Sequence, residues 1–264
     1  MSFQLSGKAP EIYENVMVPL WFGRWAEALI ELVDPKNGEN ILDVACGTGV
    51  TTRLVKEKVG PSGHVTGLDI NAGMLIKARE LALDLDIEFT KSDVVDTTLQ
   101  SNSFNAVISQ HGFHYFPDQA AALAEFYRVL APQGRIAISI WDGHSAYTKA
   151  ICRAVEKYIS PEIAKIQRGQ RITPSVSDLA KQLSGAKFEH VEIVRQQLTI
   201  KVPKPSEFVP LHLGSMPIAQ AFIDLTDDQK HALIYDVENS MKDCINGDQM
   251  TYSDAVNVAT GIKS

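Results

Sequence analysis

Apolar runs of strand length alternate with amphipathic segments of helix length along the first half of the chain. The first run begins at Ile41, and later runs span residues 64–69, 87–90, 106–110 and 135–141. Between them, residues 51–59 and the face made by Leu123, Phe126, Tyr127 and Leu130 have helical spacing. Strands that alternate with helices form a mostly parallel sheet covered on both faces, so this half predicts an α/β fold.

Helical patterns flank this core on both sides. Upstream, apolar residues recur at helical spacing until Asp34-Pro35 ends the pattern; they are Trp21, Trp25, Ala28, Leu29 and Leu32. Downstream, the sequence predicts helices near residues 147–159 and 176–183, a strand over 188–202, a helical stretch over 206–245 and a last strand over 250–262. Within the helical stretch, Thr226 and Gln229 form a capping box.

Together these elements predict one domain built on a doubly wound, seven-stranded and mostly parallel sheet, with a helical lid between its last two strands. Its expected parts are an N-terminal helical segment (1–34), a ligand-binding core (35–142), helices with the sixth strand (143–202), the lid (203–249) and the last strand (250–264). The lid carries several apolar residues without an evident core of its own, namely Phe208, Leu211, Leu213 and Met216. We therefore expect it to be mobile and to close over a substrate.

A glycine-rich turn follows the first apolar run, in the sequence Asp-Val-Ala-Cys-Gly-Thr-Gly from residue 43 to 49. Gly47 and Gly49 have no β-carbon, so the main chain can approach a ligand closely before the next helix starts. A dinucleotide site favours Gly-x-Gly-x-x-Gly beneath a diphosphate. This turn lacks the third glycine and is expected to carry Asp43 within it, which suits a cationic, amino-bearing ligand better.

Two further carboxylates follow the next strands. Asp69 comes about 20 residues after Gly49, the spacing at which an acidic residue accepts hydrogen bonds from ribose hydroxyls. Asp69 is less suited than Asn71 to cap the helix that begins near Ala72. After the third strand, Asp93 can accept the exocyclic amine of adenine, although a solvated loop acid would give the same pattern.

The glycine turn and the three carboxylates, in this order, resemble the class I S-adenosylmethionine-dependent methyltransferases. The resemblance is greatest to small-molecule enzymes akin to the ubiquinone/menaquinone C-methyltransferases; it is strong over residues 41–141 and limited to layout elsewhere. It implies that the cofactor is S-adenosylmethionine and that a methyl group is transferred to an O, N or C atom. The acceptor implied is a small apolar or aromatic metabolite, such as a natural product or a quinone-like compound. The family joins its last two strands in a hairpin, so the helical insertion is a departure similar to the lids of natural-product methyltransferases.

The resemblance and the positions of the strand ends together predict which residues form the site. The expected cofactor-binding residues are Asp43, Ala45, Gly47, Thr48, Gly49, Asp69, Ile70, Met74, Asp93, Val94 and Gln110. Met74 lies either under the adenine or in the core, and Gln110 can bind the methionine moiety. The expected substrate-binding residues are Tyr13, Trp21, Phe113, Tyr115, Phe208 and His212, for each of which ordinary packing is the alternative.

Two histidines after the fourth strand are the catalytic candidates. His111 and His114 follow the carboxyl end of that strand, which is the crevice end of an open α/β sheet. An unperturbed histidine titrates near pH ~6.5 and can act as a base at neutral pH. We expect one of the two to face the acceptor and the other to pack and form hydrogen bonds locally.

The composition of the chain argues against several classes of binding partner. The chain has 264 residues, a formal charge of −7 and no cluster of basic residues, which argues against a nucleic-acid partner. Three cysteines without paired spacing indicate reduced thiols and no metal site. Met1–Pro10 lacks the features of a signal peptide, and no run of eighteen apolar residues occurs.

We therefore expect a cytoplasmic, soluble monomer or homodimer with no membrane partner. The alternatives left open are a nicotinamide-dependent oxidoreductase and a non-catalytic domain that retains the cofactor fold. The missing third glycine and Asp43 argue against the oxidoreductase.

Overall fold

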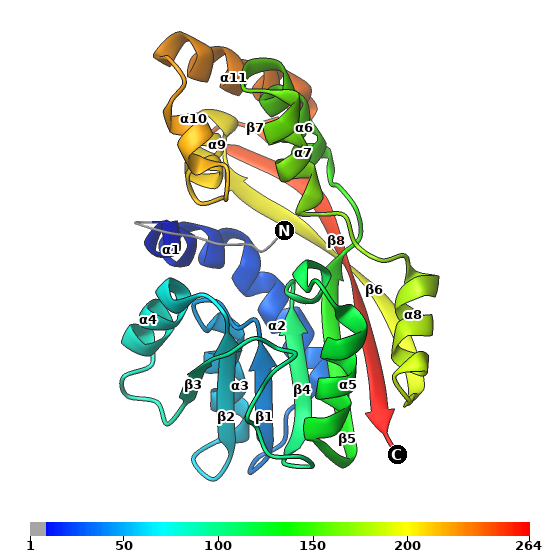
Figure 1. Ribbon diagram of the computed structural model, residues 1–264. Coiled ribbons are helices and arrows are strands. Elements are labelled where there is room, and N and C mark those ends of the chain that lie inside the picture. The colour runs from blue at the N-terminus through cyan, green and yellow to red at the C-terminus, as the bar shows by residue number, and fades with distance from the viewer. Residues whose placement is uncertain (1–8) are drawn as a thin grey trace.

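The computed structural model describes residues 9–264 and has the predicted α/β architecture (Figure 1). Five parallel strands form one part of the sheet: β1 (Asn40–Val44), β2 (His64–Asp69), β3 (Glu88–Lys91), β4 (Phe104–Gln110) and β5 (Leu130–Trp141). The full strand order is β3-β2-β1-β4-β5-β8-β6. The expectation about a signal peptide falls on residues 1–10, most of which lie outside the described residues.

Helices cover both faces of the parallel strands. They are α2 (Gly23–Val33), α3 (Val50–Val59), α4 (Ala72–Leu81) and α5 (Gln119–Val129). Two buried clusters lie on the sheet, one containing Ile41, Val55 and Ala106, the other Leu42, Val107 and Phe126. Their alternation along β1 and β4 follows from the two-residue period of a strand, which places neighbouring side chains on opposite faces.

Of the last two long strands, only β8 runs antiparallel to the others, and β6 has the direction of β1–β5. β8 (Gln249–Lys263) lies between β5 and β6 (Phe188–Pro203) and pairs with both, as well as with the short β7 (Ile245–Asn246), which the sequence pattern did not predict. In Figure 1, β6 and β8 continue past the parallel strands and carry a second group of helices at their far end. The mostly parallel sheet and its antiparallel final strand are thus confirmed.

This second group of helices comes from two separate parts of the chain. It comprises α6 (Ala146–Tyr158), α7 (Pro161–Gly169), α9 (Pro205–Gly214), α10 (Ala219–Ile223) and α11 (Asp227–Ser240), which is followed by a 3₁₀ turn, η3 (Lys242–Cys244). By contrast, α8 (Val176–Gly185) packs against β6 beside α5. The capping box of Thr226 and Gln229 is present at the start of α11. Helix α7 was not predicted.

The segment predicted to be a lid shares the hydrophobic core of the rest of the chain. Phe208, Leu213 and Met216 are buried in the same cluster as Trp21 and Tyr147. Only Leu211 among the apolar residues named for the lid is more than one third exposed. Closure of this segment over a substrate is therefore a proposal that has to accommodate a well-packed resting position.

The N-terminal segment lies between the two groups of helices (Figure 1). After α1 (Ala9–Ile12), residues Tyr13–Phe22 form a π-helix, η1, whose end is marked by the amide of Gly23 donating to the carbonyl of Val18. Helix α2 then ends at Asp34, as predicted, although Leu32 is exposed rather than on the packed face. Functional sites often contain π-helical turns, and this one supplies a wall of the cavity described next.

Candidate active site

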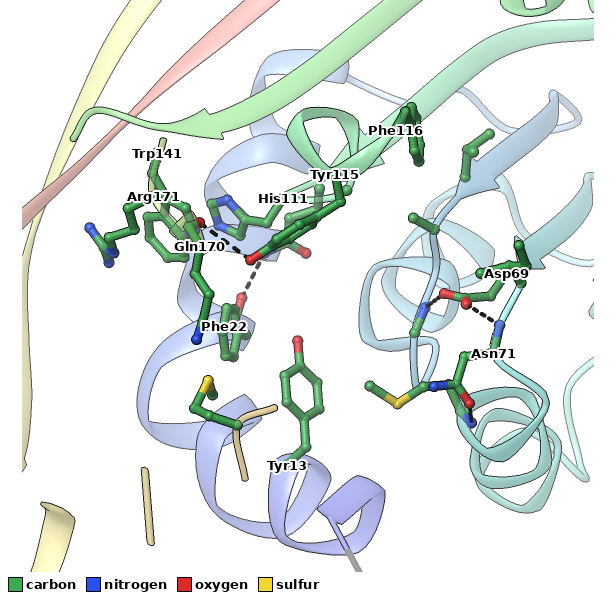
Figure 2. A pocket seen from close by; sticks show the side chains of 18 of the residues that line it. Tyr13, Phe22, Asp69, Asn71, His111, Tyr115, Phe116, Trp141, Gln170 and Arg171 are labelled. Atoms are coloured by element: carbon green, nitrogen blue, oxygen red, sulfur yellow. Dashed lines mark hydrogen bonds between the residues drawn. The ribbon is translucent and has the colours of Figure 1, made fainter. Parts of the chain in front are cut away.

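A cavity of about 220 Å³ lies where the parallel strands end (Figure 2). The last residues of four strands line it: Val44 of β1, Asp69 of β2, Gln110 of β4 and Trp141 of β5. Open α/β sheets bind ligands in this position, outside the carboxyl ends of their strands. The opposite wall comes from η1 and from the second group of helices.

The glycine-rich turn forms the floor at the β1 end. Ala45, Gly47 and Gly49 all have positive φ, at 57°, 58° and 82°. A β-carbon at Gly47 would meet no atom within 4 Å, so the main chain here lies open to the cavity. Gly49 lines neither the main cavity nor the small hollow beside it, and it acts instead as the N-cap of α3.

Asp43 is not in the turn, contrary to the prediction, because it belongs to β1. It is 1% exposed and faces the small hollow with Gly47 and Thr48. Its Oδ2 accepts a hydrogen bond of 2.6 Å from Thr52 Oγ1, and burial raises its pKa to about 7. A cation bound beside this carboxyl group would lower its pKa and favour its ionised form.

Asp69 organises the turn from β2. Its two oxygens accept hydrogen bonds from the amides of Gly47 (2.9 Å) and Asn71 (2.8 Å), as Figure 2 shows. Burial raises its pKa. Asn71, as predicted, caps α4 by accepting from the amides of Gly73 and Met74. Asp69 therefore faces the cavity in a fixed orientation, with lone pairs left for further donors.

The remaining predicted cofactor residues also line one hollow or the other. Ile70, Met74, Asp93 and Val94 line the main cavity, Val94 and Met74 being buried and Asp93 exposed. Thr48 lines the small hollow, and its hydroxyl oxygen has no partner among residues 9–264. Gln110 borders both hollows, donating to the carbonyl of Phe22 (2.9 Å) and accepting from Thr51 (2.5 Å), which ties η1 to the sheet.

At the other end of the cavity the lining is aromatic. Trp21, Phe22, Tyr115 and Trp141 lie there, and Tyr13 stacks on Phe22 with a centroid separation of 4.9 Å. In Figure 2 the Tyr13 ring stands between the Asp69 side and the Trp141 side. A flat, apolar acceptor fits this aromatic lining better than a highly charged one.

His111 faces this aromatic end. Its imidazole stacks on Trp141, with centroids 3.8 Å apart and planes inclined by 6°, and its backbone has a positive φ of 54°. It is 8% exposed, yet neither ring nitrogen has a hydrogen-bond partner in the described part of the chain. Burial, with His114 and Arg171 nearby, holds its pKa well below the usual range, so the ring is neutral.

His114 has a different environment. It does not line the cavity, and its Nε2 lies 3.1 Å from the carbonyl oxygen of Gln170, which also accepts from Tyr115 at 3.3 Å. Burial lowers its pKa to about 4. The structure therefore brings only His111 of the two catalytic candidates to the cavity, and neither histidine has the unperturbed pKa used in the sequence argument.

The substrate-binding predictions divide in the same way. Tyr13, Trp21, Tyr115 and His212 line the cavity, and His212 Nδ1 lies 2.9 Å from the Tyr147 hydroxyl. Phe113 and Phe208 do not line it, because both are fully buried in the two hydrophobic clusters.

A buried ion pair lies behind Trp141. Arg171 and Asp254 are joined by two hydrogen bonds of 2.9 and 2.6 Å, with side chains 5% and 2% exposed. Asp254 also accepts from Trp21 Nε1 at 3.2 Å. Sequence reasoning missed this pair and the neighbouring lining residues His144, Thr148, Cys152, Gln167 and Gln170. Ser160 as N-cap with Pro161 next to it marks the start of α7 and could have drawn attention to this region.

Within residues 9–264, no three His, Cys, Asp or Glu side chains gather closely enough to hold a metal ion. Over the same residues, no helix is long and apolar enough to cross a membrane.

Comparison with known proteins agrees with this geometry. Residues 41–134 match a family described as "Methyltransferase domain". Over 186 residues the chain is 31% identical to the demethylmenaquinone methyltransferase of Listeria welshimeri. The aligned region covers 65% of this chain and 79% of that protein.

Solved structures share the fold at low sequence identity. A candidate methyltransferase of Bacillus halodurans superposes with a TM-score of 0.59 at 18% identity, over 90% of this chain and 98% of its own. Phosphoethanolamine N-methyltransferase 2 of Haemonchus contortus, solved with S-adenosylhomocysteine, gives 0.59 at 16% identity, over 91% of this chain and 52% of its own.

Proposed function

Because the chain belongs to the class I S-adenosylmethionine-dependent methyltransferases, in the branch that includes the demethylmenaquinone methyltransferases, we propose that it methylates a small aromatic acceptor at an oxygen or carbon atom. The observation that carries the proposal is a cavity with carboxylates at one end and a neutral, unpartnered imidazole among aromatic rings at the other.

The residues at the first end fit the cofactor. Gly47 leaves open space beside the main chain, and none of Asp43, Asp69 and Asp93 forms an ion pair within residues 9–264. A cationic nucleoside suits such a set. We assign Asp69 to the ribose hydroxyls, Asp93 with Val94 and Met74 to the adenine, and Asp43 with Gln110 to the amino-acid part. When bound, S-adenosylmethionine supplies an electrophilic methyl group, so the protein mainly has to align an acceptor with it.

His111 is the residue we assign to the acceptor. A neutral imidazole carries one N–H donor and one acceptor nitrogen, so it can hold a hydroxyl oxygen and take its proton as that oxygen, or the ring carbon conjugated with it, becomes nucleophilic. Its low pKa makes it a weak base. We therefore expect its contribution to come from placing the acceptor oxygen as much as from removing the proton. His114, bonded to Gln170, supports the wall.

The charges at the acceptor end argue against an amine. Asp254 contacts the aromatic end through Trp21, and its oxygens already accept from Arg171, Trp21 and the amide of Ala255. Among residues 9–264 the carboxylates that line the cavity are Asp69 and Asp93, both assigned to the cofactor, so none is left to hold an ammonium group. By contrast, His111, whose ring nitrogens have no partner in the same residues, suits a hydroxyl. This favours a phenolic or quinol-like acceptor over an amine.

Two parts of the proposal concern the whole protein. We assign segment 203–249 the role of a lid, because His212 and Met216 bring it to the cavity wall. We also assign the enzyme to the cytoplasm, where its three free cysteines, two of them buried, would stay reduced.

The test is incubation with methyl-labelled S-adenosylmethionine and matched phenols, quinols and arylamines, followed by mass spectrometry. Labelled oxygen- or carbon-methyl products, lost in His111→Ala but retained in His190→Ala, would support the proposal; His190 is exposed on β6 and does not line the cavity. Preferred labelling of arylamines would overturn the choice of acceptor. Cofactor binding without any transfer would favour a non-catalytic domain, and tighter binding of a nicotinamide dinucleotide would favour the oxidoreductase.

A further inference from the structure

Arg171 lines the cavity, and the protein holds both terminal nitrogens of its guanidinium. Nη1 donates to the carbonyl of Gly143 (3.0 Å) and to Asp254 Oδ1 (2.9 Å), and Nη2 donates to Asp254 Oδ2 (2.6 Å). Both ends of its planar fork are therefore used. Since three of its five N–H donors are taken, an acidic acceptor would have to compete with Asp254 for this guanidinium.

The flat face of the guanidinium lies on Trp141. The Arg171 Cζ is 3.8 Å from the centre of the indole, and the His111 centroid is also 3.8 Å from it. Two groups at this distance cannot share one face of the ring without colliding, and Figure 2 shows the indole between them. The three side chains thus form one stack, in the order Arg171, Trp141, His111.

Each end of this stack is fixed. At one end Asp254 of β8 holds the guanidinium, and Thr173 holds the backbone of Trp141 by donating to its carbonyl at 2.9 Å. At the other end, His111 has a positive φ and its amide donates to the carbonyl of Ser139 at 2.9 Å. With no hydrogen bond on either ring nitrogen in the described chain, the imidazole plane is set by its aromatic neighbours. Trp141 is the one that stacks on it, and Phe22 and Trp25 contact it edge-on.

We propose that Arg171 is a positioning residue that acts through Trp141, bracing the indole so that the imidazole of His111 is presented to the acceptor in one orientation. The proposal rests on the function assigned to His111 above. A planar cation held by a bidentate pair is rigid, and it stacks on an indole more favourably than a lysine ammonium does. The ion pair with Asp254 then serves orientation in addition to joining the 170–174 loop to β8.

The test substitutes lysine, which keeps a charge opposite Asp254 but loses the planar face. Protein labelled in its histidine rings gives a separate NMR signal for each of the seven histidines, and His111→Gln identifies the one that is absent. In wild-type protein the His111 ring signal should be displaced upfield by the current of the stacked indole. In Arg171→Lys it should move back toward the position of an unstacked histidine. This readout needs neither cofactor nor acceptor, so it remains decisive if no methyl transfer is found.

Turnover gives the second readout. We expect Arg171→Lys to lower kcat about ten- to a hundredfold, the scale of a misplaced catalytic group, with cofactor affinity within about twofold of wild type. In the His111→Gln background the same change should have almost no further effect, because the two residues act as one unit. Arg168→Lys is the matched control, since Arg168 pairs with Glu156 at the surface of α7.

An unchanged His111 signal in Arg171→Lys would overturn the proposal, and so would an equal loss of kcat in the wild-type and His111→Gln backgrounds. Should the lysine variant fail to fold, Asp254→Asn loosens the guanidinium while keeping its shape. It must then shift the His111 signal in the same direction, and no shift would count against the proposal.

Discussion

We predict that the carboxylate of Asp43 lowers the stability of the free protein and strengthens its binding of the cofactor. The carboxyl is 1% exposed, accepts a hydrogen bond from Thr52, and has no cation beside it within residues 9–264. Its replacement by asparagine keeps the shape and an oxygen that can accept from Thr52, and it removes the ionisable group. We therefore expect Asp43→Asn to stabilise the free protein at alkaline pH and to weaken its binding of S-adenosylmethionine.

The magnitude follows from the pKa. Folding raises the pKa of Asp43 from 3.8 to about 7. Below pH 3.8 both the folded and the unfolded chain hold this proton, so it has no effect; as pH rises, the unfolded chain releases it first and the folded state loses stability until about pH 7. A difference of about 3 in pKa corresponds to about 4 kcal/mol, which is the upper limit of the destabilisation at pH 8.

The assay is urea unfolding of wild type and Asp43→Asn at several pH values, with the exposed Asp84→Asn as control. The variant should gain stability over wild type at pH 8, and the gain should disappear toward pH 4. Calorimetry near pH 7 in buffers of different ionisation heat should show wild type releasing up to about half a proton as the cationic cofactor binds, and the variant none. A stability difference independent of pH, or equal proton release in both proteins, would refute the assignment.

Four further outcomes are expected. Asp69→Ala should weaken cofactor binding by about 1.5–3 kcal/mol, the range for hydrogen bonds to a charged group, and a loss below about twofold in calorimetry would contradict its role. His111→Ala should lower kcat by about 10²–10⁴-fold and His114→Ala should lower stability instead; the reverse pattern would exchange their roles. Turnover should show no histidine-dependent change between pH 6 and 9, because burial lowers the pKa of His114 to about 4 and that of His111 well below its usual range, so a midpoint near 6.5 would be unexpected. Amide exchange in segment 203–249 should slow when cofactor and acceptor are both bound, and protection confined to the Gly47 turn would argue against a lid.

The sequence predicted β2, β3 and β4 well because each is a short run bounded by turns, whereas β5 begins five residues before its predicted start. β2 has the predicted bounds, and the predicted starts and ends of β3 and β4 differ from the observed ones by at most two residues. Asp43 was placed wrongly because a carboxylate in a strand is normally read as its end. The cost of burying it is offset here by Thr52, nine positions later, which the strand pattern does not reveal.

The acceptor end was less predictable. Which of His111 and His114 faces the cavity depends on the positive φ of His111, and no glycine or asparagine marks that position. Arg171 and Asp254 lie 83 residues apart, and an ion pair of that separation leaves no local pattern. The burial of the lid's apolar residues was not predictable, because they pack against Trp21 and Tyr147, from distant parts of the chain.

The place of β8 in the sheet sets an order for folding. β8 follows β6 in the sequence but lies between β5 and β6, so β6 cannot join the sheet until β8 has been synthesised. Until β8 is in place, Arg171 also lacks its ion-pair partner, because Asp254 lies on β8. We therefore expect a nascent chain to complete the nucleoside-binding half first and to acquire its acceptor half in one late step, when a single strand closes both the sheet and the ion pair.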